Sequence, residues 1–286
     1  MVPRLGFVVD KLPVSPSPLL TAPGAVPAPE GSLDAGVAWH HGDPLGEQRK
    51  PREGNELAVL SVIGPDAVTV LDAAGVVAPA EPYAAVAVPG GGFVRRMPWP
   101  TADSFDLLIP REGLATWWGR LTAAGAAPAG TWAFEALRVA AARPRIGLDT
   151  DDRTIPHEVR WIGGPAEHGA VHLEKGCYRG QETVARVHNL GKPPRHLVLL
   201  HLDGSAEGRP EPGDPVTAGG RAVGRIGTVI DHHELGPIAL ALVKRSIPTD
   251  TELVVGSCAA SIDPDSVPAD DTVQAGRAAV DRLRGR

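Results

Sequence analysis

The feature that most constrains the fold is a change of pattern near residue 195. From there to residue 262, short apolar runs alternate with turns that are rich in glycine and proline. The apolar runs lie at residues 197–202, 216, 222–223, 226–230, 238–243, 253–255 and 258–262. Short runs at this spacing are typical of an all-β unit, most simply a small barrel or a sandwich. We therefore predict a C-terminal β-barrel at residues 193–262.

The region before the barrel, residues 36–192, has a mixed pattern that predicts an α+β fold class. Strands are expected at residues 57–63, 84–88 and 105–110. Helices are expected at residues 66–74, 114–121 and 132–142. Within the second helix, Trp117 and Trp118 share an apolar face with two leucines, which favours a packed tryptophan pair over a stacking platform.

The two ends of the chain follow neither pattern. Residues 1–35 are rich in proline, serine, alanine and glycine, which favours a flexible N-terminal extension. Residues 263–286 begin as a polar linker, and a short terminal helix is expected at 273–284. One side of that helix would carry Ala279, Val280 and Leu283. No apolar run approaches the length of a transmembrane helix, so we expect no interaction with a membrane.

Composition narrows the classes of function. The chain has 28 basic and 34 acidic side chains and a net charge of −6, which argues against non-specific binding to nucleic acid. The two cysteines, Cys177 and Cys258, lie far apart, and no zinc-type spacing of cysteine and histidine occurs. We therefore expect a reduced, cytoplasmic protein without a metal site of its own.

The segment with the most chemistry is residues 175–182, KGCYRGQE. Cys177 lies between two glycines of this segment, and one cation stands two residues to either side. The glycines are Gly176 and Gly180, and the cations are Lys175 and Arg179. A helix is predicted at residues 181–190, so the thiol would lie at the positive end of a helix dipole, where its thiolate is favoured. The residues alone leave open a tight loop with a half-buried, inert cysteine.

Three roles for Cys177 remain open: a nucleophile, a transient ligand of a metal or cluster, and a redox thiol. A nucleophile needs a base within about 3 Å, and His172 and His188 are close in the sequence. A stable iron–sulfur cluster needs several thiolates, so we expect no stably bound metal or cluster. Cys258 falls in a predicted strand and is expected to be a small core residue.

The segment 175–182 resembles the signature of the YgfZ family, which comprises folate-binding-type iron–sulfur assembly factors related to the glycine-cleavage aminomethyltransferase. The likeness extends over residues 131–160, which contain a TIPHE sequence, and over residues 183–262. It is strong for residues 130–262 and partial for residues 36–130. The resemblance implies an aminomethyltransferase-like folate-binding fold, with three lobes around a channel and a β-barrel as the last lobe.

The same resemblance implies a function and a site. It implies an iron–sulfur cluster assembly or repair factor in which Cys177 is essential and tetrahydrofolate is the cofactor. The cofactor-binding residues would be Lys175, Gly176, Tyr178, Gly180, Gln181, Glu182 and Arg138. Its partners would be iron–sulfur client or assembly proteins, and any link to tRNA modification would be indirect, without contact to nucleic acid. A folate-dependent one-carbon transferase and a non-catalytic interaction module are the alternatives to this assembly role, which is not that of a conventional enzyme.

The chain departs from the family pattern in two places. Residues 42–49 lead almost directly to residues 57–67, so most of the first lobe is expected to be missing, which would expose a folate in the channel. Ala140 stands where relatives often carry an acid. Arg138 remains, and it can pair with a folate carboxylate or with Glu135, or lie along the surface of its helix.

Acidic residues supply two further candidates. Asp149, Asp151 and Asp152 form a cluster before the TIPHE sequence, for which a solvated turn is the expectation and a hard-cation site the alternative. Glu182 falls in the first turn of a predicted helix, where the helix dipole favours it. Its functional alternative is to accept hydrogen bonds from a folate pterin or from the Lys175 ammonium.

Overall fold

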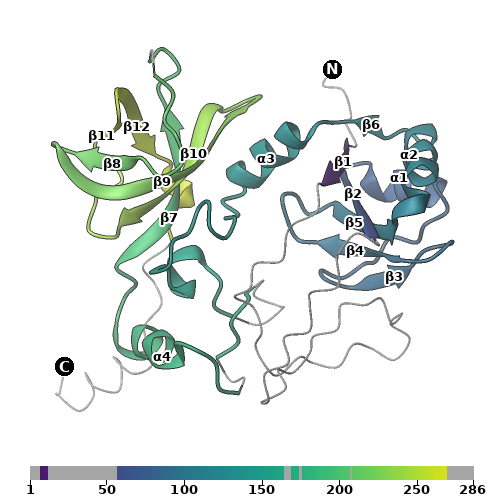
Figure 1. Ribbon diagram of the computed structural model, residues 1–286, viewed down its shortest axis with the longest axis horizontal. Coiled ribbons are helices and arrows are strands. Elements are labelled where there is room, and N and C mark those ends of the chain that lie inside the picture. The colour runs from purple at the N-terminus through teal and green to yellow at the C-terminus, as the bar shows by residue number, and fades with distance from the viewer. Residues whose placement is uncertain (1–6, 12–56, 164–168, 174–175, 207, 269–286) are drawn as a thin grey trace. The chain divides into compact units, whose positions relative to one another are not determined.

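The computed structural model describes residues 7–11, 57–163, 169–173, 176–206 and 208–268 (Figure 1). These residues form two compact units. The first comprises the described residues up to Phe134 together with Gly176–Tyr178, and the second comprises the other described residues from Glu135 onward. The division falls inside helix α3 (Thr131–Ala140), whereas the expected boundary was between residues 192 and 193.

The first unit is a six-stranded sheet with helices packed on one face. The strand order is β3-β4-β5-β2-β1-β6, and neighbouring strands are antiparallel except for the parallel pair β1 and β6. The strands are β1 (Phe7–Lys11), β2 (Leu57–Ile63), β3 (Ala85–Ala87), β4 (Phe93–Met97), β5 (Ser104–Pro110) and β6 (Ala127–Pro128). The helices are α1 (Ala67–Ala73), the short 3₁₀ helix η1 (Arg111–Gly113) and α2 (Leu114–Ala123).

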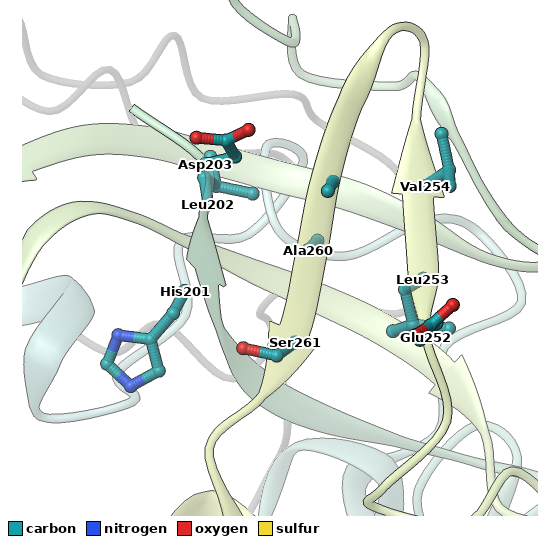
Figure 2. Close-up of a pocket in the computed structure, with 9 residues that line it drawn as sticks. His201, Leu202, Asp203, Glu252, Leu253, Val254, Ala260 and Ser261 are labelled. Carbon is teal, nitrogen blue, oxygen red and sulfur yellow. The ribbon is translucent and has the colours of Figure 1, made fainter. Parts of the chain in front are cut away.

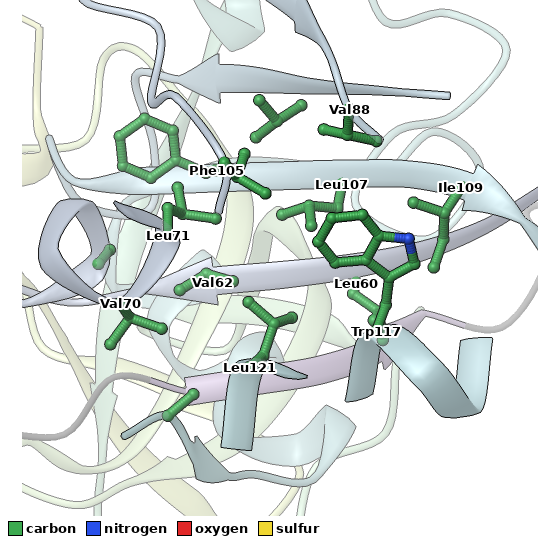
Figure 3. Close-up of a cluster of buried hydrophobic side chains, with 14 of the residues drawn as sticks. Leu60, Val62, Val70, Leu71, Val88, Phe105, Leu107, Ile109, Trp117 and Leu121 are labelled. Atoms are coloured by element: carbon green, nitrogen blue, oxygen red, sulfur yellow. The ribbon is translucent and has the colours of Figure 1, made fainter. Parts of the chain in front are cut away.

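The core of the first unit lies between the sheet and its helices (Figure 3). Alternate residues of β2 and β5 point toward the helices and are buried, as the period of a strand requires. Helix α1 contributes Val70 and Leu71, and helix α2 contributes Trp117 and Leu121. Trp117 is only 4% exposed and Trp118 packs against the same cluster, which confirms the expected packed tryptophan pair.

Strand β1 corrects one expectation about the N-terminal residues. Phe7–Lys11 was expected to belong to a loose extension, but it pairs with β2 along its whole length, from Phe7 opposite Ile63 to Lys11 opposite Val59. Because β2 would otherwise be left with unpaired backbone groups on that side, a short run such as FVVDK is enough to complete the ladder. The other residues of 1–35 lie outside the described residues.

The second unit contains a closed barrel of six strands in the order β10-β7-β12-β11-β8-β9. The strands are β7 (Arg195–Leu202), β8 (Pro215–Ala218), β9 (Arg221–His232), β10 (Gly236–Lys244), β11 (Leu253–Val255) and β12 (Cys258–Ile262). The remaining elements are the end of α3, the 3₁₀ helices η2 (Pro156–Val159) and η4 (Pro264–Ser266), and helix α4 (Gln181–Leu190). The barrel that the sequence predicts is thereby confirmed.

The barrel strands β7 and β10 are buried on both faces, which explains their continuous apolar runs. One set of their side chains fills the barrel interior together with Cys258, which is 1% exposed, as expected for a small core residue. The other set packs outside the barrel against Ala136 and Val139 of α3 and against Val159 of η2. A strand that packs against apolar residues on both faces does not need to alternate apolar and polar residues along its length.

A single carboxylate fastens the loop after α3 to strand β9. Asp149 is 1% exposed, and its Oδ1 accepts hydrogen bonds from the Thr228 backbone N–H at 2.6 Å and from the Thr228 hydroxyl at 2.8 Å. A Cβ atom at Gly227 would lie 2.3 Å from the same Oδ1. Only glycine therefore allows the carboxylate to approach the strand this closely.

Helix α4 packs on η2 through two histidines. The rings of His157 and His188 lie with their centroids 5.8 Å apart. Both ring nitrogens of His157 are buried without a hydrogen-bond partner among the described residues. Burial, and then the neighbouring His188, lower the pKa of His157 from its usual value of 6.5, so the ring is held neutral.

The close approach at Gly227 predicts the effect of one methyl group. Gly227→Ala should lower the free energy of unfolding by about 1–3 kcal/mol, because the new Cβ displaces the Asp149 carboxylate. Urea unfolding followed by circular dichroism measures the change. Gly204→Ala is the matched control, because a Cβ there meets its nearest atom, Cγ of Pro237, at an ordinary 3.4 Å. Equal stability of the two variants would contradict the close approach.

The lowered pKa of His157 predicts a dependence of stability on pH. Between the folded and unfolded pKa values the unfolded chain binds more protons, so the free energy of unfolding should fall as the pH drops from about 7.5 to about 5.5. His157→Phe cannot take up that proton, so its stability should fall less over this range, while the exposed control His233→Phe should follow the parent chain. Urea titrations at several pH values measure the slopes. Identical slopes for His157→Phe and the parent would refute the prediction.

Candidate functional site

The segment predicted to carry the chemistry leads into α4. Cys177 is exposed and is not in a disulfide, and the neighbouring Gly176 is exposed as well. Gly180 is the N-cap residue of α4 and has φ = 83°, a left-handed conformation that favours glycine. A Cβ atom at position 180 would have no neighbour within 4 Å, so a side chain would not clash there. Glycine is favoured at this position because of the left-handed backbone conformation. Lys175 lies outside the described residues.

The next residues expected at a cofactor site differ in exposure. Tyr178 and Gln181 are half-buried, and Glu182 is exposed in the first turn of α4. Burial raises the pKa of Tyr178, so its phenol is a neutral hydroxyl near neutral pH. The carboxylate of Glu182 lies where the helix dipole favours a negative charge and can accept hydrogen bonds from a ligand.

His172 and His188 were the candidate bases for Cys177. Both are exposed, and His188 stacks near His157 on η2. His188 thus has a structural role in seating α4. A catalytic pair of Cys177 with either histidine stays a prediction.

Arg138 was expected among the cofactor-binding residues, and its surroundings assign it a structural role instead. It is 2% exposed, and all five N–H donors of its guanidinium are engaged. Its acceptors are Glu135 Oε2, at 3.0 Å from Nε and 2.8 Å from Nη2, Asp149 Oδ2 at 2.9 Å, Thr228 Oγ1 at 2.7 Å and the Arg143 carbonyl oxygen. Of the alternatives that the sequence left open, the pair with Glu135 is the one observed. A folate carboxylate would find no free donor on Arg138.

The acidic cluster before the TIPHE sequence is not one site. Asp149 is buried beside Arg138, so the expectation of a solvated turn was wrong for this residue. Asp151 pairs with Arg195 at 2.7 Å, and Asp152 is exposed. Among the described residues, no three side chains of histidine, cysteine, aspartate or glutamate are grouped so that they could hold a metal ion.

The acid of the TIPHE sequence also has a structural role. Glu158 is 1% exposed, and its carboxylate receives two hydrogen bonds from Arg195, at 2.8 and 2.9 Å. Arg195 also donates to both carboxylate oxygens of Asp151. Hydrogen bonds from Arg195 hold the pKa of Asp151 well below its usual range, and those to Glu158 and Asp151 raise the pKa of Arg195. These bonds attach η2 and its preceding turn to the start of β7.

One buried polar cluster in the first unit was not foreseen from the sequence. Ser61, Asp106 and Arg95 are cross-strand neighbours on the sheet face opposite the helices. Ser61 Oγ donates to Asp106 Oδ1 at 2.5 Å, and Arg95 Nη2 donates to Asp106 Oδ2 at 3.0 Å. Asp106 is 3% exposed. The available signal was an acid in the middle of the apolar run SFDLLIP, which indicates a paired carboxylate on the second face of that strand.

A groove on the barrel was also not foreseen. It is an open hollow of about 520 Å³ on the outer face of β7, β12 and β11. Its floor is built from small residues of β12, and Asp203 and Glu252 lie on opposite sides of that strand (Figure 2). The alternation of β12, with Ala259 and Ser261 exposed and Cys258 and Ala260 buried, places only short side chains on the outside.

No helix within the described parts of the chain has the length and apolar character that crossing a bilayer requires.

Comparison with known proteins identifies similar families. The profile of the CAF17 C-terminal β-barrel domain matches residues 195–269. A putative chloroplastic transferase of Arabidopsis thaliana is 32% identical over 124 residues, which are 43% of this chain and 26% of that protein. The aminomethyltransferase of Herpetosiphon aurantiacus is 30% identical over 198 residues, which are 66% of this chain and 52% of the enzyme. This chain thus spans about a quarter to a half of the length of these two relatives.

A solved structure shows the same fold. The glycine cleavage system aminomethyltransferase T of Bartonella henselae superimposes with a TM-score of 0.59 at 19% sequence identity, over 74% of this chain and 60% of that structure. The expected shortening between residues 49 and 57 falls outside the described residues. The CAF17-type barrel, the aminomethyltransferase-like fold and the related sequences all agree with the resemblance of this chain to the YgfZ family.

Proposed function

We propose that this protein is an iron–sulfur cluster assembly or repair factor of the YgfZ type, which acts in the cytoplasm with Cys177 as its essential residue. The observation that carries the proposal is the contrast between the two cysteines. Cys177 is exposed next to a glycine in a segment with the family signature, whereas Cys258 is buried in the barrel. An exposed thiol can reach a partner, and a buried one cannot.

In this proposal Cys177 is a transient ligand and the cluster is cargo. One thiolate does not hold a cluster by itself, so the other ligands come from an iron–sulfur client, an assembly protein or a small thiol. Cluster-dependent enzymes, including tRNA-modifying ones, would benefit indirectly. The chain's net charge of −6 argues against direct binding of nucleic acid.

Tetrahydrofolate is the proposed cofactor, and the described residues fit it in part. The exposed carboxylate of Glu182 suits the N–H donors of a pterin, and the Tyr178 hydroxyl can donate or accept. Lys175, Gly176, Gly180 and Gln181 complete the proposed set. Arg138 leaves the set because its donors are engaged within the protein.

The names of the relatives favour a second candidate, a folate-dependent one-carbon transferase. This candidate requires turnover of a one-carbon unit on tetrahydrofolate, which the assembly role does not. A non-catalytic interaction module would show neither turnover nor a need for Cys177.

Substitution of Cys177 tests the assembly role. In cells that lack the protein, Cys177→Ser should restore less than about a tenth of the activity of a cluster-dependent enzyme, because an alcohol is a far poorer ligand than a thiolate. Cys258→Ala is the control and should restore most of the activity, since it removes a buried sulfur of the barrel core. Full rescue by Cys177→Ser would refute the assembly role of this thiol and favour an interaction module.

Substitution of Glu182 tests the folate site. Titration calorimetry with tetrahydrofolate should show binding, and Glu182→Gln should weaken it about tenfold, because a charge-assisted hydrogen bond is lost. Asp152→Asn is the control, since this exposed carboxylate is outside the proposed set. Absence of binding by the parent chain would contradict the folate part of the proposal alone. One-carbon transfer catalysed by the purified protein would favour the transferase.

A further inference from the structure

Basic side chains gather at one end of the barrel, where β7 begins and β10 ends. We call them the basic cluster, which consists of Arg143, Arg160, His196 and Arg245. His196 is the second residue of β7 and shares its face with Val198, which lies in the barrel interior. Arg245 belongs to the same face, because His196 pairs with Val243 two positions before it. The backbone N–H of Arg245 continues the ladder to the Pro194 carbonyl oxygen at 2.9 Å.

Arg160 and Arg143 join the basic cluster from outside the barrel. Arg160 ends η2, and its guanidinium donates to the Ser266 carbonyl oxygen in η4, which is itself bound to β7. Its φ of 58° is a left-handed conformation, which is uncommon for a residue with a side chain and is often found at ligand sites. Arg143 follows Ala142, which packs in the same apolar cluster as Trp161, the residue after Arg160. Burial, and then the charge of Arg143, lower the pKa of Arg160.

The described acids of the second unit do not balance these charges. No carboxylate among the described residues forms an ion pair with Arg143 or Arg160. The buried acids are engaged by other arginines, namely Glu135 and Asp149 by Arg138, and Asp151 and Glu158 by Arg195. At η4, Asp263 lies beside His201 at 3.5 Å, and Asp265 is exposed. Cations that are collected in this way repel one another, and a bound anion would relieve the repulsion.

His196 gives an independent reason to expect a ligand. It is 7% exposed, and its Nδ1 is buried without a hydrogen-bond partner among the described residues. Burial, and then the charges of Arg245 and Arg160, lower the pKa of His196, so the ring is neutral and has one N–H to donate. Buried polar atoms without a partner are rare in native proteins, and a bound ion or ligand is one of their causes.

We propose that the basic cluster binds a small oxyanion of the phosphate class. Arg143 and Arg160 donate to its oxygens from the loop after α3 and from η2, while Arg245 and the His196 imidazole complete the site from the barrel strands. Donors that come from four separate parts of the chain suit the tetrahedral oxygens of a phosphate better than a planar carboxylate. The bound anion would fasten η2 to the end of the barrel. This site is independent of the proposed role of Cys177.

Titration calorimetry of the full chain with inorganic phosphate, at an ionic strength held constant with chloride, tests this proposal. The parent should bind one phosphate, and Arg143→Gln and Arg160→Gln should each weaken the binding about tenfold, as expected for the loss of a charge-assisted hydrogen bond. Arg209→Gln is the control and should leave the affinity unchanged. Arg209 pairs with Asp231, which lies opposite Pro237 at the other end of β10.

Urea unfolding separates a ligand site from a purely structural cluster. In chloride alone, Arg143→Gln should be at least as stable as the parent, because it removes repulsion between like charges. Phosphate should raise the urea midpoint of the parent and leave that of Arg143→Gln almost unchanged. An equal response of the two proteins would overturn the proposal.

Four results of the binding experiments would also overturn it. The first is a parent chain that shows no saturable binding of phosphate. The second is an unchanged affinity in both Arg143→Gln and Arg160→Gln. The third is acetate that binds as tightly as phosphate, which would assign the site to carboxylates. The fourth is displacement of phosphate by a short single-stranded oligonucleotide, which would assign it to a nucleic-acid backbone.

Discussion

The second unit depends on one buried pair of opposite charges, Arg138 of α3 and Asp149 of the loop that follows it. Neither residue is more than 2% exposed, so removal of Arg138 would leave the Asp149 carboxylate without a compensating charge in the interior, at a cost of about 3–5 kcal/mol. The pair shares Thr228 with strand β9, and it requires glycine at position 227. Through these contacts the helix, the loop and the barrel hold a single arrangement.

A second set of charges, also within the second unit, extends this arrangement to helix α4. Arg195 at the start of β7 binds Asp151 and Glu158, and η2 supports α4 through His157 and His188. The family-like residues of the TIPHE segment therefore act by positioning α4. This explains how a resemblance can extend well beyond the residues that would touch a ligand.

Much of the fold could be predicted because apolar runs report burial directly. The runs at residues 57–63, 197–202 and 238–243 became β2, β7 and β10 almost residue for residue. Strand β1 was not predicted from the sequence, because its partner β2 lies about fifty residues away and the five residues of β1 have prolines on both sides. The structural role of Arg138 was not predicted for a similar reason, because its hydrogen-bond partner Thr228 is 90 positions away in the sequence. Spacing along a chain cannot show which charges meet in space.

The proposed chemistry rests on a thiol that is open to partners while the other cysteine is buried. The most direct measurement is the rate of alkylation of the native full-length chain by iodoacetamide at neutral pH, resolved for each cysteine by mass spectrometry. The proposal predicts that Cys177 reacts at about the rate of an accessible thiol such as glutathione, while Cys258 reacts only after unfolding. A Cys177 that reacts as slowly as Cys258 in the native chain would contradict it.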